Sequence, residues 1–198
     1  MKKIKRIFLF FLSKDKLQFS GENNLYLEFE NLTIRDAAIS DAELLTKWWN
    51  DGSIMIDVGF PYGLGKNVQK VKNEIERREF NLLILELNKI PIGEMNYKKH
   101  DEQSAAIGIK ICDSSLQNKG LGKKYLSLLI SSLFNNYGYK KIVLDTALNN
   151  KRAQHVYEQI GFRKLGIREN CWRDQVGNLQ SAVDYELTEY EFIDYTTR

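Results

Sequence analysis

The chain has 198 residues, of which 43% are hydrophobic, and a formal net charge of +3. That length suits one domain with a well-developed core, with or without a short appendage. The weak charge gives no support for a nucleic-acid partner, although small anionic ligands are compatible with it. The chain contains only 2 prolines, which argues against long linkers, and no apolar run has the length that a membrane span requires.

The cysteine and histidine positions argue against disulfides and metal sites. Cys112 and Cys171 lie far apart in the sequence and form no metal-ligand spacing with His100 or His155. We therefore expect two free thiols in a reducing compartment, a cytoplasmic protein, and no metal cofactor.

The first 24 residues differ in composition from the rest. Their basic start is followed by an apolar run, residues 7–12, that is shorter than the core of a secretion signal and lacks a small-x-small cleavage site. Three interpretations stay open: an extra strand or helix packed on the domain, which we favour, an arm that binds a membrane surface or a partner, and a flexible tail. We do not expect membrane contact, and we assign residues 1–24 to an extension of unknown role and 25–198 to the folded domain.

The next segments predict a strand or hairpin over residues 25–34 and then two helices. Ser40 and Glu43 have the spacing of a capping box, which would open the first helix. Its Trp48 and Trp49 are adjacent and cannot face one direction, so we expect one to pack inward and the other toward a cleft. The alternative is that both belong to the core.

A glycine-rich loop over residues 54–66 precedes a charged helix over 67–78. Three apolar segments then predict an antiparallel meander, with a tight turn after the first: residues 80–87, 90–97 and 105–112. An amphipathic helix over 125–134 leads to a short buried strand over 141–146. This strand–helix–strand order implies a parallel pairing of 105–112 with 141–146.

The chain ends with a helix and a hairpin. Asn150 is a suitable N-cap for a helix that Gly161 would terminate. The remaining residues, 162–192, alternate around a turn at 174–178 and predict two paired strands.

The stretch from Ser115 to Tyr125 carries the clearest signal for a ligand. Gly120 and Gly122 lie between a predicted strand and a predicted helix, where glycine lets the backbone approach a ligand and turn its N–H groups outward. The start of a helix also favours an anion. Three lysines add positive charge: Lys119, Lys123 and Lys124. The pattern is neither a Walker loop nor a Rossmann fingerprint, and a plain glycine-rich turn is the alternative to a phosphate site.

Two segments together resemble the GNAT superfamily of N-acetyltransferases: Gln117-x-x-Gly120-x-Gly122 and Asn150-x-Arg152-Ala153-x-x-x-Tyr157-Glu158-x-x-Gly161-Phe162. The resemblance covers residues 25–192 and is nearest to the branch with ribosomal-protein, spermidine and some aminoglycoside acetyltransferases. It implies a mixed α+β fold, the GNAT fold, in which a central, mostly antiparallel sheet with flanking helices contains one splayed parallel strand pair.

The same resemblance implies acetyl-CoA as donor and an amine as acceptor. The pyrophosphate would lie on the backbone N–H groups of residues 117–122, and the pantetheine would enter between the splayed strands. The residues that would contact the donor are Ile109, Ile111, Gln117, Asn118, Lys119, Gly120, Leu121, Gly122, Lys123 and Asn150.

For catalysis, the resemblance implies Tyr157 as general acid. A phenol, with a pKa near about 10, can protonate a leaving thiolate without being ionised at rest. A packing role on the sheet is the alternative. Glu94 is the best candidate to take the amine proton, directly or through water, although it could also be a solvated outward residue; Asp145 is a weaker candidate. A covalent route through Cys112 is not favoured, because no neighbour in sequence lowers the pKa of its thiol.

We therefore expect transfer of acetyl to a primary amine of a peptide N-terminus, a polyamine or an aminoglycoside-like compound, by direct attack on the thioester. The acceptor would meet residues 51–67 and 171–180, which contain three carboxylates and three aromatic side chains able to hold a cation: Asp51, Asp57, Phe60, Tyr62, Trp172 and Asp174. A catalytically silent acyl-CoA-binding regulatory module is the alternative function, and a homodimer is an open possibility.

Overall fold

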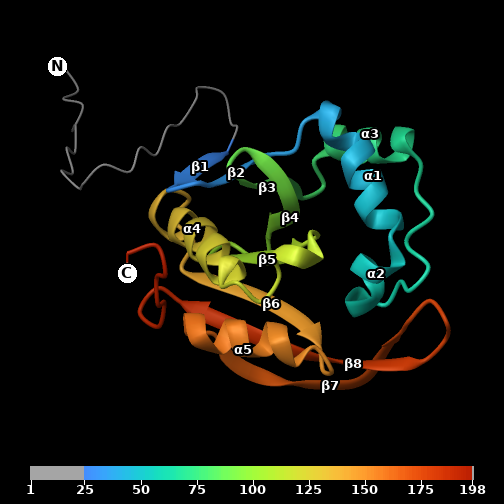
Figure 1. Cartoon of the computed structure of the whole chain (residues 1–198). Coiled ribbons are helices and arrows are strands. Elements are labelled where there is room, and N and C mark those ends of the chain that lie inside the picture. Colours follow the sequence, from blue (N-terminus) through green and yellow to red (C-terminus); the bar gives the residue numbers. More distant parts are fainter. Residues whose placement is uncertain (1–24, 198) are drawn as a thin grey trace.

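In the computed structural model, which describes residues 25–197, the strands form one eight-stranded sheet with helices on both of its faces (Figure 1). The proposed extension over residues 1–24 lies outside the described residues. The strands are β1 (Tyr26–Phe29), β2 (Leu32–Asp36), β3 (Asn81–Leu87), β4 (Ile90–Lys99), β5 (Ser104–Ile111), β6 (Lys141–Ala147), β7 (Arg163–Arg173) and β8 (Leu179–Thr188). Their order is β1-β2-β3-β4-β5-β6-β8-β7, and every neighbouring pair is antiparallel except β5 and β6. This confirms the predicted fold class.

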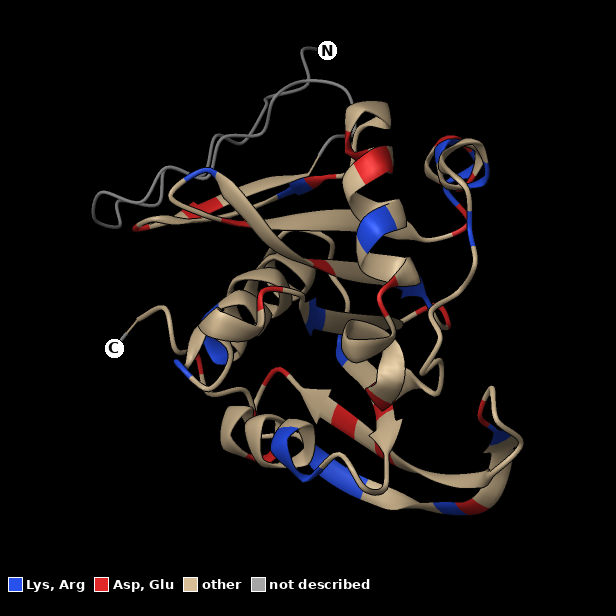
Figure 2. Ribbon diagram, turned by 45° about the vertical axis from the view of Figure 1, so that its right-hand side comes forward, with Lys and Arg blue, Asp and Glu red and all other residues tan. Residues whose placement is uncertain are grey.

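Five α-helices and three short 3-10 helices accompany the strands in the described residues. The α-helices are α1 (Ala42–Asn50), α2 (Gly52–Met55), α3 (Val68–Arg77), α4 (Leu121–Asn135) and α5 (Lys151–Ile160), and the 3-10 helices are η1 (Ile39–Asp41), η2 (Ile56–Val58) and η3 (Ser114–Leu116). None of these helices is long and apolar enough to cross a membrane. Figure 2 shows Lys and Arg interspersed with Asp and Glu over the described elements.

The two faces of the sheet carry separate hydrophobic clusters. In β3, Leu83 and Leu85 pack with α4 and α5, whereas Leu82 and Ile84 pack with α1 and α3. Successive side chains of a strand point to opposite faces, so the nearly continuous apolar run of β3 is what a strand buried on both faces requires. Figure 1 shows α1 and α3 on the side of the sheet away from α4.

The parallel pair β5–β6 is joined at only one end. Its three paired positions are Ser104 with Lys141, Ala105 with Ile142 and Ala106 with Val143. Beyond them β5 continues to pair with β4, and β6 continues to pair with β8. The two strands therefore part toward their carboxyl ends, as predicted, and leave backbone groups on both facing edges free to meet a ligand.

Helix α4 begins at Leu121, four residues earlier than the sequence pattern predicts. Gly120, with φ of 77°, adopts the left-handed conformation and turns the chain directly into the helix. The polar first turn contains glycine and two lysines, so it carries no apolar periodicity that would have revealed it.

The predicted capping box at Ser40 is wrong. The backbone N–H of Ala38 donates to the carboxylate of Asp41 at 2.7 Å, and Arg35 holds the same carboxylate through two nitrogen atoms at 2.7 and 2.9 Å. Residues 39–41 consequently form η1, and α1 starts after it. An ion pair with a residue of β2 thus determines the start of this helix.

The glycine-rich segment over 54–66 is only partly a loop, because it contains the end of α2 and all of η2. Trp48 and Trp49 are both buried, which confirms the core alternative. The predicted charged helix is α3, one residue shorter at each end, and the side chain of Asn67 caps it. Asn88 and Lys89 form the predicted tight turn, with positive φ at both residues.

The carboxyl-terminal elements follow the prediction closely. The Asn150 side chain accepts a hydrogen bond from the N–H of Ala153 at 3.1 Å and caps α5. Gly161 ends this helix with φ of 104°. The final strands, β7 and β8, form the predicted hairpin, and β8 inserts between β6 and β7.

Candidate functional site

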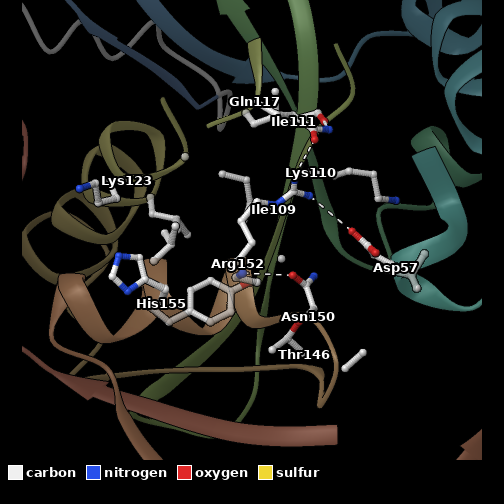
Figure 3. Close-up of a pocket in the computed structure, with 18 of the residues that line it drawn as sticks. Asp57, Ile109, Lys110, Ile111, Gln117, Lys123, Thr146, Asn150, Arg152 and His155 are labelled. Carbon is white, nitrogen blue, oxygen red and sulfur yellow. Dashed lines mark hydrogen bonds and ion pairs between the residues drawn. The ribbon is translucent and has the colours of Figure 1, made fainter. Parts of the chain in front are cut away.

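A cleft of about 850 Å³ opens where β5 and β6 part (Figure 3). This volume falls in the range typical of small-molecule sites. Of the candidate residues, these line the cleft: Glu94, Ile109, Ile111, Gln117, Asn118, Gly120, Leu121, Gly122, Lys123, Asn150 and Tyr157. Lys119 does not. The structure therefore brings together, from β4, β5, α4 and α5, residues that are distant in sequence.

The turn before α4 presents unused backbone donors to the cleft. Within the described residues, the N–H groups of residues 118–122 donate to no protein oxygen. A Cβ built at Gly120 or Gly122 would meet no heavy atom within 4 Å, so the space above these residues is open. Free N–H groups at the start of a 15-residue helix, in an open hollow, fit the phosphates of a nucleotide-bearing cofactor.

The three lysines near this turn have different environments. Lys119 is exposed. Lys123 donates to Gln159 of α5 at 2.9 Å and lies over the ring of Tyr195, whereas Lys124 pairs with Glu30 at 3.0 Å. Lys124 is thus held toward the β1–β2 turn, and Lys123 is the lysine of the three that lines the cleft.

A chain of polar contacts crosses the opening between β5 and β6. Gln117 donates from its side-chain amide to the carbonyl of Ile111 at 3.0 Å and accepts a hydrogen bond from Arg152. The same guanidinium reaches Asp57 of η2 at 3.4 Å (Figure 3). Arg152 therefore connects the turn before α4 with the segment that follows α2. Sequence reasoning noticed Arg152 only as part of a motif, because nothing local indicates what an exposed arginine will contact.

Glu94 is buried, with 8% of its surface exposed, so the solvated alternative for this residue is wrong. It accepts a hydrogen bond from Trp49 Nε1 at 2.7 Å and lies 3.4 Å from the Nζ of Lys110, which is its direct neighbour on β5. Its carboxylate thus stands at the cleft with a fixed orientation. Lys110 was missed by the sequence analysis, although a single lysine between Ile109 and Ile111 in an apolar strand was a usable signal.

Tyr157 is 7% exposed and packs edge-on against Tyr185 and at a tilt against Phe162. Burial, with a smaller contribution from Asp145, raises the pKa of its phenol well above the usual value. No protein acceptor among the described residues binds its hydroxyl, and that oxygen is not among the enclosed polar atoms without a partner. The hydroxyl is therefore neutral and open to the cleft.

Three other residues with titratable side chains are placed less favourably for catalysis. Asp145 lines the cleft but is held by Arg168 at 2.6 Å. His155 is exposed at the rim. Burial raises the pKa of the Cys112 thiol to about 12, with Glu94 adding to the effect, so this thiol is protonated at neutral pH.

The two predicted acceptor segments lie against each other. Gln175, at the β7–β8 turn, donates from its backbone to Gly59 at 2.8 Å, and its side chain bonds the backbone of Tyr62 and Gly63. Of the predicted cation-binding residues, Asp57 and Trp172 line the cleft. Asp51 and Asp174 instead cap local turns. Among residues 25–197, no three His, Cys, Asp or Glu side chains gather as metal ligands would.

Comparisons with known proteins identify a family and several relatives that are similar to this chain. A family model described as an acetyltransferase (GNAT) domain matches residues 31–163, more than half of the chain. An uncharacterized protein of Methanocaldococcus jannaschii is 29% identical over 150 residues, which are 73% of this chain but only 31% of that protein. The ribosomal protein bS18-alanine N-acetyltransferase of Haemophilus ducreyi is 29% identical over 99 residues, or 43% of this chain and 68% of that protein.

Among solved structures, spermidine N-acetyltransferase from Vibrio cholerae in complex with CoA and spermine is similar, with a TM-score of 0.71. The sequence identity is 22%, and the match covers 81% of this chain and 97% of that chain. At this sequence identity the structural similarity establishes the fold alone. Membership of the family is established by the family model, which matches the sequence over residues 31–163. The chain belongs to the GNAT acetyltransferase family.

Proposed function

We propose that this protein transfers the acetyl group of acetyl-CoA to a primary amine. The observation that carries the proposal is the cleft between β5 and β6, which is lined both by the turn before α4, where the N–H groups of residues 118–122 are free, and by Tyr157 with its unbonded hydroxyl. CoA is bound in the similar Vibrio cholerae structure, and that protein and the Haemophilus ducreyi relative are named N-acetyltransferases.

The donor would be held by backbone and side chains of the cleft. The N–H groups of residues 118–122 would bind the pyrophosphate, with Lys123 adding charge beside them. The free edge of β5 at Ile109 and Ile111, together with Asn150, would bind the pantetheine arm. Bound there, the thioester supplies an acyl group that an amine can attack.

Two side chains would handle the protons. Glu94 would accept the proton that the amine loses, directly or through a water. Tyr157 would donate its proton to the departing thiolate, which is a role for which a phenol held neutral by burial is suited. The nitrogen gains the acetyl group, and CoA leaves as the thiol.

The amine is proposed only as a class. Peptide N-termini, polyamines and aminoglycoside-like compounds are all candidates, because related proteins include a ribosomal-protein acetyltransferase and a spermidine acetyltransferase. The test measures thiol release from acetyl-CoA with a panel of primary amines, alongside CoA affinity by calorimetry. We expect turnover with at least one amine. Tight CoA binding with no turnover on any amine would instead support a silent CoA-binding module.

A further inference from the structure

Lys110 has hydrogen-bonding capacity that the protein does not use. Its side chain is 19% exposed, and within the described residues its Nζ has two contacts: the sulfur of Met55 at 2.9 Å and Glu94 at 3.4 Å. An ammonium group has three donors, and a thioether is a weak acceptor. A largely buried cation is expected to be better satisfied than this.

Glu94 does not need Lys110 as its main partner. The indole N–H of Trp49 already donates to the Glu94 carboxylate at 2.7 Å, which is shorter by 0.7 Å than the contact with Lys110, at 3.4 Å. Both Glu94 and Lys110 line the cleft. Lys110 points toward α2, the acceptor side, because it alternates along β5 with Ile109 and Ile111, which pack against the core on the face of α4 (Figure 3).

The carboxylates of the cleft, by contrast, all have cationic partners. Asp57 pairs with Arg152, Glu94 with Lys110, and Asp145 with Arg168. A polyamine would have to share these carboxylates with the cations already paired to them, and it would bring no anion to Lys110. If the acceptor carries its own anionic group, its amine can lie at Glu94 while the anion binds Lys110, so that every charge in the cleft keeps a partner of opposite sign.

We infer that the acceptor carries a carboxylate close to its amine, as an α-amino acid does, and that Lys110 is the residue that binds this carboxylate. The amine would lie at Glu94, and the acid group would lie at Lys110, its neighbour across the strands. This inference rests on the proposed acetyl transfer, but it replaces the three acceptor classes considered above, because none of them carries a free carboxylate next to its amine.

The test uses matched trios of acceptors: an α-amino acid, its carboxamide and the corresponding amine without the carboxyl group, with spermidine as a further acceptor. For the wild-type protein, kcat/KM for thiol release should be highest for the carboxylate, by about tenfold or more. Lys110→Met should lower kcat/KM for the carboxylate at least about tenfold more than for the carboxamide and the plain amine, which share any loss that comes from removing the ion pair with Glu94. Lys98→Met, an exposed lysine of β4, should change none of them.

Spermidine or the plain amine serving as well as the carboxylate would overturn the inference, as would an equal loss for all acceptors in Lys110→Met. If no amine is turned over although CoA binds, the proposed function is wrong. The anion site at Lys110 is then tested separately, by measuring how the three compounds of a trio bind to the CoA-loaded protein. Calorimetric binding of the carboxylate, lost in Lys110→Met, would then still support the anion site. Equal binding of carboxylate and carboxamide by the wild-type protein would reject it.

Discussion

Tyr157 and Glu94 reach the cleft from different elements, and each has a defined environment there. Tyr157 comes from α5 with its hydroxyl unbonded, and Glu94 comes from β4 with one oxygen fixed by Trp49. A neutral donor and an oriented carboxylate are the pair that amine attack on a thioester requires. The residue roles proposed here therefore depend on burial as much as on position.

Replacing Tyr157 with phenylalanine keeps the ring packing against Phe162 and Tyr185 and removes only the hydroxyl. We expect kcat to fall by about a hundredfold or more, because proton donation to the thiolate is lost. The affinity for CoA, measured by calorimetry, should stay within about twofold. Full activity of the variant across the pH range would refute the acid role.

Cys112 is close to Glu94 but is not expected to take part. Its thiol, with a pKa near 12, remains protonated from neutral pH up to the alkaline range, so almost no thiolate is present to attack the thioester. Cys112→Ala should keep kcat within about threefold of the wild-type value. The assignment is wrong if the wild-type protein accumulates an acetyl-thioester that the variant lacks.

Helix α4 supplies the proposed phosphate site and also holds it in position. Its start at Gly120 exposes free N–H groups, and its apolar stripe fixes the helix on the sheet through buried residues such as Leu126, Leu129 and Leu133. The first turn is therefore held rigidly over the opening between β5 and β6. A rigid set of donors binds an anion without having to be ordered first.

Gly120→Glu tests this arrangement and has a matched control in Gly138→Glu. Both glycines have positive φ, 77° and 75°, and a Cβ at either position meets nothing within 4 Å. The two substitutions should therefore cost similar conformational stability, roughly 1 kcal/mol each. Only Gly120→Glu should weaken CoA binding, by tenfold or more, because it adds a negative charge and bulk beside the free N–H groups of residues 118–122. Unchanged affinity in both variants would show that the phosphates lie elsewhere.

Much of the architecture was predictable from local pattern. The apolar run of β3, the two glycines at the start of α4 and the Asn150 cap all act through neighbours in sequence, so their consequences could be foreseen. The start of α1 could not, because it depends on Arg35 reaching Asp41. The contacts of Lys110 and Arg152 could not be foreseen either, since the folded chain supplies their partners.

At the scale of the whole molecule, the parted strands divide the sheet into two halves that α4 and α5 hold together. Phe134, Tyr157 and Tyr185 belong to one continuous cluster that spans both halves. The residues that line the cleft therefore pack in the same core that stabilises the whole domain. Deprotonation of a tyrosine in this core should lower the free energy of unfolding of the whole domain.

Tyr185 provides a test of this coupling. Burial, together with its hydrogen bond to Glu158, raises its pKa to about 12, whereas tyrosine in an unfolded chain titrates near about 10. Between these values the unfolded state releases its proton first, so the free energy of unfolding falls as pH rises. Tyr185→Phe should show a shallower fall from pH 10 to 12 in urea titrations; a slope identical to that of the wild-type protein would contradict the assignment.

The reaction that we propose for the cleft between β5 and β6 is direct transfer of acetyl from acetyl-CoA to an amine nitrogen. Mass spectrometry after incubation with isotopically labelled acetyl-CoA and a mixture of amines tests it most directly. We predict labelled acetyl on the nitrogen of a free amine, none retained on the protein, and strongly reduced label with Tyr157→Phe. Label that remains on the protein, or no labelled amine from any acceptor while CoA still binds, would contradict the account.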